Sequence, residues 1–232
     1  MVYVKLPVAD AWCVRTPRVV RFLEPEYVDA FFQKGELQLS CFEKFSRHTD
    51  EARGDGHEGM HVARGSVAGG GVFTSTLLFG AQALVLSLTS NDDAATAREL
   101  CPECTAGIII NDTTRFGTAV AQCLPDLVRG YEGACIYRET PAPVTMPTFT
   151  GEIDPDQLPH ILAQVQDQYS HEGYFIKRLK FRSQFEYRLI WTVIDPVTSA
   201  RVITCPDARQ FCSRWADPRI DPFAAPLHST PV

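Results

Sequence analysis

The segment from Phe175 to Val193, FIKRLKFRSQFEYRLIWTV, constrains the fold more strongly than any other part of the sequence. Apolar and polar side chains alternate near its end, as they do in a β-strand that packs one face against a core. We expect the core face to carry Phe185, Tyr187, Leu189, Trp191 and Val193, and the opposite face to carry Gln184, Glu186, Arg188, Ile190 and Thr192. The pattern therefore predicts a sheet with a stripe of polar side chains on one face.

This polar stripe places a carboxylate beside several cations. Gln184, Glu186 and Arg188 follow one another on the same face of the expected strand. Four cations lie within the six residues just upstream: Lys177, Arg178, Lys180 and Arg182. A carboxylate on a rigid strand beside cations can hold an anionic ligand and keep an acid or base next to it. The alternative is an outer sheet face with ordinary ion pairs, because ion pairs alone can perturb a carboxylate.

Size and charge limit the class of protein. A chain of 232 residues, 45% of them hydrophobic, suits one large domain or two small ones. The formal net charge of −6 argues against nucleic-acid binding over the whole surface, although residues 177–182 could form a local basic patch. The first residues lack the apolar run of a signal peptide, and two buried strands explain the uncharged run from Gly65 to Asn91 better than a membrane span does. We therefore expect a cytoplasmic protein without membrane contact, whose eight cysteines are reduced thiols.

The order of the expected elements predicts an α+β fold with a mixed, largely antiparallel sheet and flanking helices. We expect strands at residues 19–23, 37–40, 71–79, 83–89, 106–110, 133–137 and 175–193, with residues 200–204 returning as a hairpin partner of the last strand. We expect helices at residues 24–37, 91–100, 113–124 and 155–169. Pro25 suits the first turn of the first helix, and Gly35 is its expected stop. Residues 18–213 would then form a single domain between an N-terminal arm at 1–17 and an extended, proline-rich tail at 214–232.

The polar, glycine-rich segment at residues 42–71 is predicted to be a long connecting loop, and such loops are often functional or disordered. It contains His57-Glu58-Gly59-Met60-His61, which matches the HExxH pattern of zinc proteases. That chemistry needs both histidines one turn apart on a helix. The many glycines around the motif argue against a helix there, so we expect no metal site.

The pair Cys101 and Cys104 has the spacing of half a zinc knuckle. A structural zinc site normally needs a second close pair of ligands, and the other cysteines lack this spacing. We therefore expect two buried thiols near the end of a helix, since free cysteine commonly behaves as a small buried hydrophobe.

Several short motifs occur in an order that resembles an uncharacterised bacterial family. They are VVRFL, FFQKGELQLS, the D-x-x-E-G loop at Asp55 to Gly59, LVLSLTS, AGIIIND and the late strand QFEYR, and together they cover roughly residues 18–195. The order is also similar to that of the ADP-ribosyltransferase superfamily, particularly its DarT-like branch. In that superfamily an early basic or histidine position and a Ser/Thr strand hold NAD, and a late (E/Q)-x-E strand carries the catalytic glutamate.

The resemblance implies a transferase that uses NAD as a substrate and acts as a glycosyltransferase in the broad sense. It places Arg21 at the early position, Ser87 on the middle strand, and Gln184 with the catalytic Glu186 in the late motif. The carboxylate would stabilise the oxocarbenium-like centre that forms when nicotinamide leaves, and would deprotonate the attacking group. The acceptor would be a protein, a nucleic acid or a small molecule, in a toxin or phage-defence role.

The remaining polar residues have roles in the same hypothesis. Arg21, Lys177 and Arg188 would hold the diphosphate of NAD through charge-assisted hydrogen bonds. The loop residues Arg53, Asp55 and Glu58 would order the acceptor or act as a lid. Two other classes remain open: a non-enzymatic protein-interaction module, and a metal-dependent nuclease that uses Asp55 and Glu58. A polar stripe that lines a pocket would favour an enzyme, and a flat exposed stripe would favour the interaction module.

Overall fold

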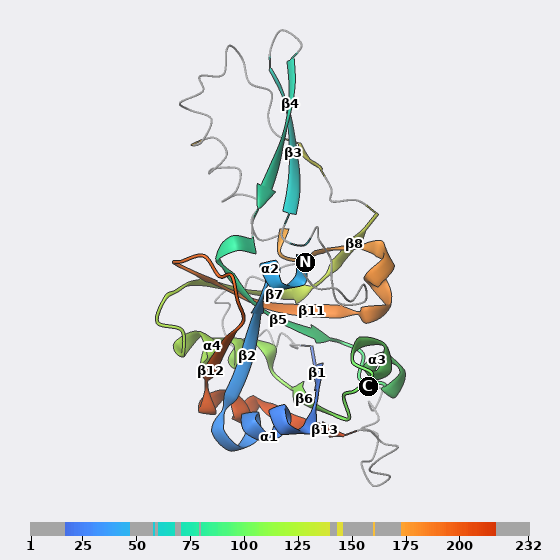
Figure 1. Ribbon diagram of the computed structural model, residues 1–232, viewed down its shortest axis with the longest axis vertical. Helices are drawn as coiled ribbons and strands as arrows, with labels where there is room; N and C mark the ends of the chain where they lie inside the picture. The colour runs from blue at the N-terminus through green and yellow to red at the C-terminus, as the bar shows by residue number, and fades with distance from the viewer. Residues whose placement is uncertain are drawn as a thin grey trace, which may run out of the picture.

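The computed structural model describes residues 17–46, 58, 60–67, 71–78, 80–139, 143–145, 160 and 173–216. Its elements in chain order are β1 (Val19–Leu23), α1 (Pro25–Lys34), β2 (Glu36–Cys41), α2 (Phe42–Ser46), β3 (Met60–Val67), β4 (Gly71–Leu78), the 3₁₀ helix η1 (Gly80–Gln82), β5 (Ala83–Thr89), α3 (Ala94–Leu100), β6 (Ala106–Ile110), α4 (Thr113–Gln122), β7 (Leu127–Ala134), β8 (Ile136–Arg138), β9 (Pro143–Thr145), β10 (Ile176–Arg178), the 3₁₀ helix η2 (Leu179–Gln184), β11 (Glu186–Val193), β12 (Arg201–Thr204), the 3₁₀ helix η3 (Pro206–Phe211) and β13 (Cys212–Ala216). This is the predicted α+β class, with few helices and a largely antiparallel sheet (Figure 1).

Within the described residues, eight strands form the main sheet, and every pair in it is antiparallel. Its principal order is β12-β2-β5-β1-β6-β13. Strand β11 pairs with β5 along the opposite edge of β5, and β7 pairs with β11. The strand β5 is therefore central: it pairs with β11 over seven residue pairs on one side, and with both β2 and β1 on the other.

Alternation on β5 and β11 builds the main core of the molecule. Leu84, Leu86 and Leu88 of β5 share this core with Tyr187, Leu189, Trp191 and Val193 of β11. The helices α1 and α4 and the 3₁₀ helix η3 cover the same face with Val28, Phe31, Phe116, Val120 and Ala208. The predicted core face of the late strand is thus confirmed at four of its five positions. The opposite face of β5 and β11 remains available for polar side chains.

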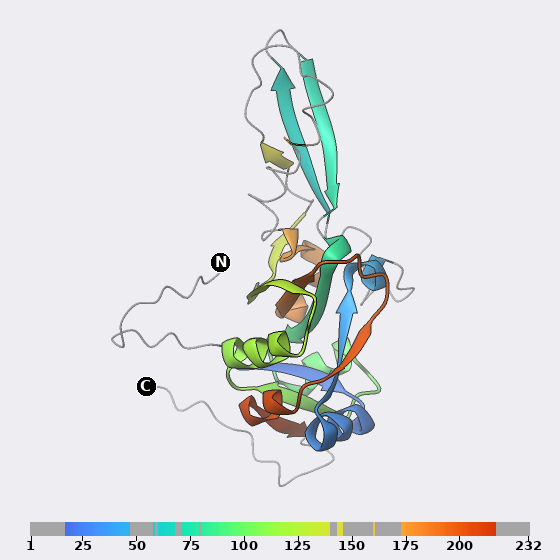
Figure 2. The same ribbon diagram turned by 90° about the vertical axis from the view of Figure 1, so that its left-hand side faces the viewer.

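A second, smaller sheet projects from the body along the long axis of the molecule (Figures 1 and 2). It contains β3 and β4 as an antiparallel pair, with β9 parallel to β3. The prediction of one long loop over residues 42–71 is therefore wrong, because α2 and β3 lie within it. The polar and glycine-rich composition suggested a loop, whereas eight cross-strand pairs with β4 support this strand.

The segment from Phe175 to Val193 is not one strand, contrary to the sequence-based prediction. It is divided into β10, η2 and β11, and the break lies at Phe185, whose φ of 45° is in the left-handed region. Phe185 is 52% exposed instead of buried in the core. The short strand β10 pairs in parallel with β8 in a separate two-stranded sheet. The predicted hairpin partner, β12, pairs with β2 and not with β11.

Helix boundaries follow the local sequence signals closely. Helix α1 starts at Pro25 and ends before Gly35, whose φ of 77° confirms the predicted stop. Helix α3 begins at Ala94, three residues after the predicted start at residue 91, and the Asp93 carboxylate caps it by accepting a hydrogen bond from the Thr96 amide. Strand β6 has the predicted bounds. The predicted tail at 214–232 starts too early, because residues 214–216 belong to β13, which pairs with β6 in the main sheet. Residues 1–16 of the arm, residues 217–232 of the tail and the predicted helix at 155–169, apart from the helical residue His160, lie outside the described residues.

Cys101 and Cys104 form a disulfide, so the prediction of two free thiols is wrong for this pair. Cys101 caps the C-terminal end of α3, and the turn that follows brings the two Cα atoms to 5.2 Å from each other. His61 lies in β3, so the HExxH sequence does not form the helix that a zinc protease needs. In the described part of the chain, no three His, Cys, Asp or Glu side chains cluster closely enough to hold a metal ion. None of the helices described there is long and apolar enough to span a membrane.

Candidate functional site

A cavity of about 280 Å³ lies on the polar face of β5 and β11. Its walls come from β1, β2, α2, β5, the end of α3 and the segment 177–186. The lining residues are Val20, Arg21, Phe22, Gln38, Ser40, Lys44, Phe45, Glu58, Val85, Ser87, Leu88, Thr89, Leu100, Cys101, Lys177, Gln184 and Glu186. Strands that are distant in sequence therefore meet at one concave surface, which is the usual setting of a small-molecule site.

The cavity forms where the main sheet opens beside β5. The start of β5 pairs with β2 at Val85 and Leu84, whereas its end pairs with β1 at Thr89. The strands β1 and β2 therefore diverge along the same side of β5. Arg21 of β1 connects them, because its Nη1 atom donates a hydrogen bond to the carbonyl oxygen of Gln38 on β2 at 2.7 Å. Arg21 and Ser87 of β5 both line the cavity.

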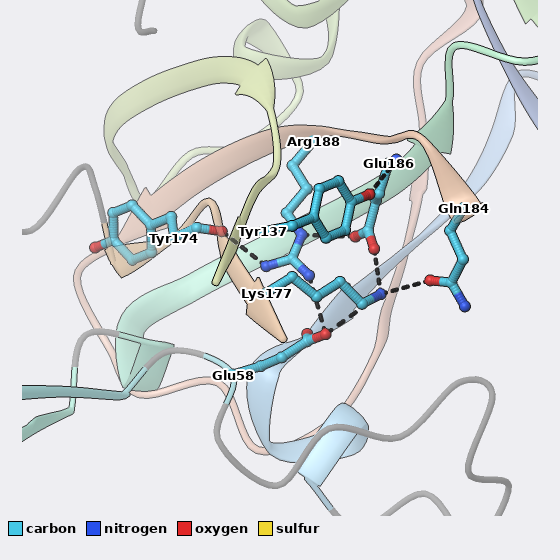
Figure 3. A network of polar contacts seen from close by, with 7 residues as sticks. All are labelled: Glu58, Tyr137, Tyr174, Lys177, Gln184, Glu186 and Arg188. Atoms are coloured by element: carbon cyan, nitrogen blue, oxygen red, sulfur yellow. Dashed lines mark hydrogen bonds and ion pairs between the residues drawn. The ribbon is translucent and has the colours of Figure 1, made fainter. Parts of the chain in front are cut away.

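Four charged side chains form a buried ionic network at the cavity: Glu58, Lys177, Glu186 and Arg188 (Figure 3). Nζ of Lys177 binds the Glu186 carboxylate and lies 3.5 Å from Oε1 of Glu58. Nε of Arg188 donates to Oε1 of Glu186 at 2.6 Å, and its Nη2 atom lies 3.0 Å from Oε1 of Glu58. Each carboxylate thus contacts both cations. The two positive and two negative charges balance within the network.

Arg188 is the innermost member of the ionic network. Its side chain is fully buried, and its Nη1 atom donates to the carbonyl oxygen of Tyr174 at 2.8 Å. The Phe42 ring lies under the guanidinium, 5.7 Å from its carbon to the ring centroid. The register of β11 with β5 places Arg188 opposite Ser87. Arg188 therefore supports the cavity wall from behind and does not line it.

The backbone of Glu186 is held as firmly as its side chain. Its amide donates to the Tyr137 hydroxyl oxygen at 2.7 Å, and its carbonyl oxygen accepts from the Cys135 amide at 2.8 Å. Burial raises the pKa of the Glu186 carboxyl, but Arg188 and Lys177 beside it outweigh burial and bring this pKa down to about 2. Glu186 is therefore a fixed, ionised carboxylate at the cavity wall.

Lys177 links the ionic network to the amide of the late motif. Its Nζ atom donates to Oε1 of Gln184 at 2.8 Å (Figure 3). Burial lowers the pKa of Lys177, but the Glu186 and Glu58 carboxylates outweigh burial and raise the pKa above its ordinary value. The ammonium therefore remains charged and fixes Gln184 and Glu186 in one arrangement.

Arg21 lies outside the balanced network. Among the described residues, no carboxylate lies within ion-pair distance of its guanidinium, whose only protein partner there is the Gln38 carbonyl. Burial lowers the pKa of Arg21 to about 10. A guanidinium that lines a cavity with no carboxylate of the described residues within ion-pair distance is suited to an anionic ligand, because a charge-assisted pair would compensate its lost hydration. The site can thus combine an anion-binding cation with an ionised carboxylate.

The structure brings most of the sequence-predicted site residues together. Six of them line the cavity: Arg21, Glu58, Ser87, Lys177, Gln184 and Glu186. Arg188 lies directly behind Glu186. Arg53 and Asp55 lie outside the described residues. The polar stripe of β11 is therefore buried against a cavity and is not an exposed outer face of the sheet.

Sequence reasoning missed several residues of the site. Ser40 and Lys44 line the cavity from β2 and α2, and Tyr137 and Tyr174 hold Glu186 and Arg188 in place. The only local signal that Ser40 belongs to the site was its position as a polar residue near the end of an apolar strand. The tyrosines act through a hydroxyl oxygen and a main-chain carbonyl, and neither role leaves a pattern in the sequence.

Comparisons with known proteins identify no relative of this chain. No protein-family model, no curated protein and no solved structure matches it. The functional assignment therefore depends on the chemistry of the site.

Proposed function

We propose that this chain is an ADP-ribosyltransferase-like enzyme that binds NAD in the cavity and uses Glu186 as its catalytic carboxylate. One observation carries the proposal: Arg21 of β1, Ser87 of β5, Gln184 at the end of η2 and Glu186 at the start of β11 line a single cavity. These are the positions that the resemblance to the superfamily selected from separate parts of the sequence. Their convergence supports the proposal because unrelated short motifs would not be expected to share one wall.

The charges of the cavity suit the substrate. The Arg21 guanidinium can bind the diphosphate of NAD as a charge-assisted donor, and the Ser87 hydroxyl lies on the adjacent strand to receive or donate a hydrogen bond. Lys44 adds a second cation from α2. Lys177 is already engaged by Glu186, Glu58 and Gln184, so its role is to position the late motif.

The state of Glu186 suits the chemistry. When the bond between nicotinamide and C1′ of the ribose breaks, nicotinamide leaves with the bonding electron pair and positive charge develops on the ribose. A fixed carboxylate with a pKa near 2 is fully ionised at neutral pH and can stabilise that charge. The acceptor then forms the new bond to C1′ and releases its proton to water. Such a low pKa makes Glu186 a better electrostatic stabiliser than a base.

The test is calorimetric titration of NAD into the purified protein, with nicotinamide release followed in parallel. We expect the wild type to bind NAD and to release nicotinamide, and Glu186→Gln to bind NAD but release at least about a hundredfold less, as is typical when an electrostatic stabiliser is removed. Glu36→Gln is the matched control, because Glu36 is half-exposed and paired with Lys34 outside the cavity. Absence of NAD binding at millimolar concentration would overturn the proposal.

NAD binding without nicotinamide release would lead to a different conclusion. If the wild type binds NAD but releases no nicotinamide with or without added protein and nucleic-acid acceptors, the chain is a nucleotide-binding module and not a transferase. Cleavage of nucleic acid that requires Mg²⁺ would instead favour the nuclease hypothesis, in which Glu58 is a metal ligand. Glu58 is already within ion-pair distance of two cations, which disfavours that hypothesis.

A further inference from the structure

The disulfide between Cys101 and Cys104 lies at the wall of the cavity. Cys101 is half-buried and lines the cavity together with Leu100, the last residue of α3. Its partner Cys104 is only 7% exposed and does not belong to the lining. The disulfide therefore joins a residue that faces the ligand space to a residue buried behind the wall.

Cys104 is anchored in a small core behind this wall. It packs there with Val20 and Phe22 of β1, which line the cavity and flank Arg21 in the sequence. The main chain holds the turn as well: the Cys104 amide donates to the Cys101 carbonyl oxygen at 3.0 Å, and the Cys101 amide donates to the Ala97 carbonyl oxygen at 2.8 Å. Because these contacts do not involve sulfur, the turn should persist when the disulfide is reduced.

The disulfide is placed where a small reductant can reach it. Pro102 and Glu103, between the two cysteines, are exposed, and Cys101 is the more accessible of the pair. A thiolate of a dithiol reductant attacks the Cys101 sulfur, and the Cys104 sulfur leaves with the bonding electrons and takes a proton. The second thiolate of the reductant then displaces the Cys101 sulfur, which also takes a proton. The reductant becomes a disulfide, and the protein gains two electrons and two protons.

We propose that this disulfide is a redox switch for ligand binding, in which the oxidised protein binds its ligand and the reduced protein binds it more weakly. Two thiols need more room than a disulfide, because atoms that are not bonded lie farther apart than bonded atoms. The core holds Cys104, so the Cys101 sulfur is displaced toward the cavity. At about 280 Å³ the cavity is close to the lower limit of ligand sites, roughly 300–1,000 Å³, so a small loss of space weakens binding.

The inference rests on the proposed function where it takes NAD as the ligand, and a second probe separates the two. Inorganic diphosphate tests the anion site at Arg21 without assuming a dinucleotide. Both probes are titrated by calorimetry into the oxidised protein and into the protein reduced with dithiothreitol. We expect the reduced protein to bind each probe at least about fivefold more weakly.

Two variants show whether the effect of the reductant acts through this disulfide. The double variant Cys101→Ser/Cys104→Ser should bind each probe with the same affinity with and without dithiothreitol. Cys123→Ser is the matched control, because Cys123 is a half-buried free thiol at the C-terminal cap of α4 and is not among the residues that line the cavity. This variant should respond to dithiothreitol as the wild type does.

The reciprocal measurement distinguishes a switch from a disulfide that only stabilises the fold. Coupling between two sites is reciprocal, so a ligand that prefers the oxidised protein must make the disulfide harder to reduce by the same factor. The fraction of reduced protein is measured at several ratios of reduced to oxidised dithiothreitol, by alkylation and mass spectrometry. We expect a saturating probe to lower the equilibrium constant of reduction at least about fivefold.

Equal affinities in the two redox states, or tighter binding by the reduced protein, would overturn the switch and leave the proposed function intact. Loss of the folded state on reduction, followed by circular dichroism at the assay temperature, would also overturn it, because the disulfide would then be purely structural. Redox-dependent binding of diphosphate without any binding of NAD would support the switch and overturn the proposed function. An oxidised protein that binds neither probe would overturn both.

Discussion

Nε of Arg188 donates to Oε1 of Glu186 at 2.6 Å, two residues away on β11, and both side chains are buried. Residues i and i+2 of a strand share a face, so the strand itself aligns the pair. Tyr187 between them points into the opposite core. The arginine thus both holds the carboxylate and keeps it ionised. This relationship connects the stability of the fold to the chemistry of the cavity.

Replacing Arg188 should be strongly destabilising. Arg188→Met leaves the carboxylates of Glu186 and Glu58 buried with Lys177 as their only remaining cation in the ionic network. Loss of one partner of a buried pair costs about 3–5 kcal/mol. Urea unfolding of the variant should show a loss of this size in the free energy of unfolding.

Arg201→Met is the matched comparison for Arg188→Met. Arg201 forms a bidentate pair with Asp126 at 2.8 and 3.0 Å, but both side chains are partly exposed. Exposed pairs contribute about 0–1 kcal/mol, so this variant should be close to the wild type. Equal losses in the two variants would contradict a special role for the buried network.

The free energy of unfolding should fall below about pH 4.5 because of Glu186. Its pKa in the folded protein is about 2, below the ordinary value of 4.5, so the unfolded chain binds this proton first as the pH decreases. The contribution of Glu186 is fully present above pH 4.5 and is lost between pH 4.5 and 2, at up to about 1.4 kcal/mol per pH unit. Urea unfolding at several pH values would measure this slope.

The variant Glu186→Gln separates this contribution from the general effect of acid. It cannot titrate at residue 186, so its stability should depend less steeply on pH between 4.5 and 2 than that of the wild type. Parallel pH profiles of the two proteins would show that Glu186 has an ordinary pKa.

Arg21→Met should separate stability from binding. The guanidinium lines the cavity and has no carboxylate of the described residues within ion-pair distance, so methionine removes the cost of its lost hydration. We expect the variant to be as stable as the wild type or more stable, and to bind NAD at least about tenfold more weakly. Thermal unfolding and calorimetry measure the two effects. A destabilised variant with unchanged NAD affinity would assign Arg21 a purely structural role.

The disulfide between Cys101 and Cys104 should stabilise the end of α3 by a modest amount. The two cysteines are three residues apart, and so short a loop contributes about 2 kcal/mol in the chain-entropy account. Dithiothreitol should lower the free energy of unfolding of the wild type by this amount. It should not change the free energy of unfolding of the double variant Cys101→Ser/Cys104→Ser, which lacks the disulfide. Alkylation of both cysteines before reduction would show that the bond is absent in solution.

Local patterns predicted the parts of the fold that depend on neighbouring residues. Alternation placed Leu189, Trp191 and Val193 in the core, because the period of a strand is a property of its own backbone. Gly35 ended helix α1 for an equally local reason, since a left-handed stop favours glycine. The polar stripe containing Glu186 and Arg188 was visible in the same way.

Long-range contacts decided the rest. The sequence alone indicated a carboxylate beside cations, but only the tertiary structure divided the segment at Phe185 and paired β5 with β1, β2 and β11. That pairing opens the sheet, places Arg21 and Glu186 in one cavity and buries Arg188 behind it. Strand pairing depends on residues that are far apart in sequence, and the stripe therefore became a buried site because of the neighbours it acquired on folding.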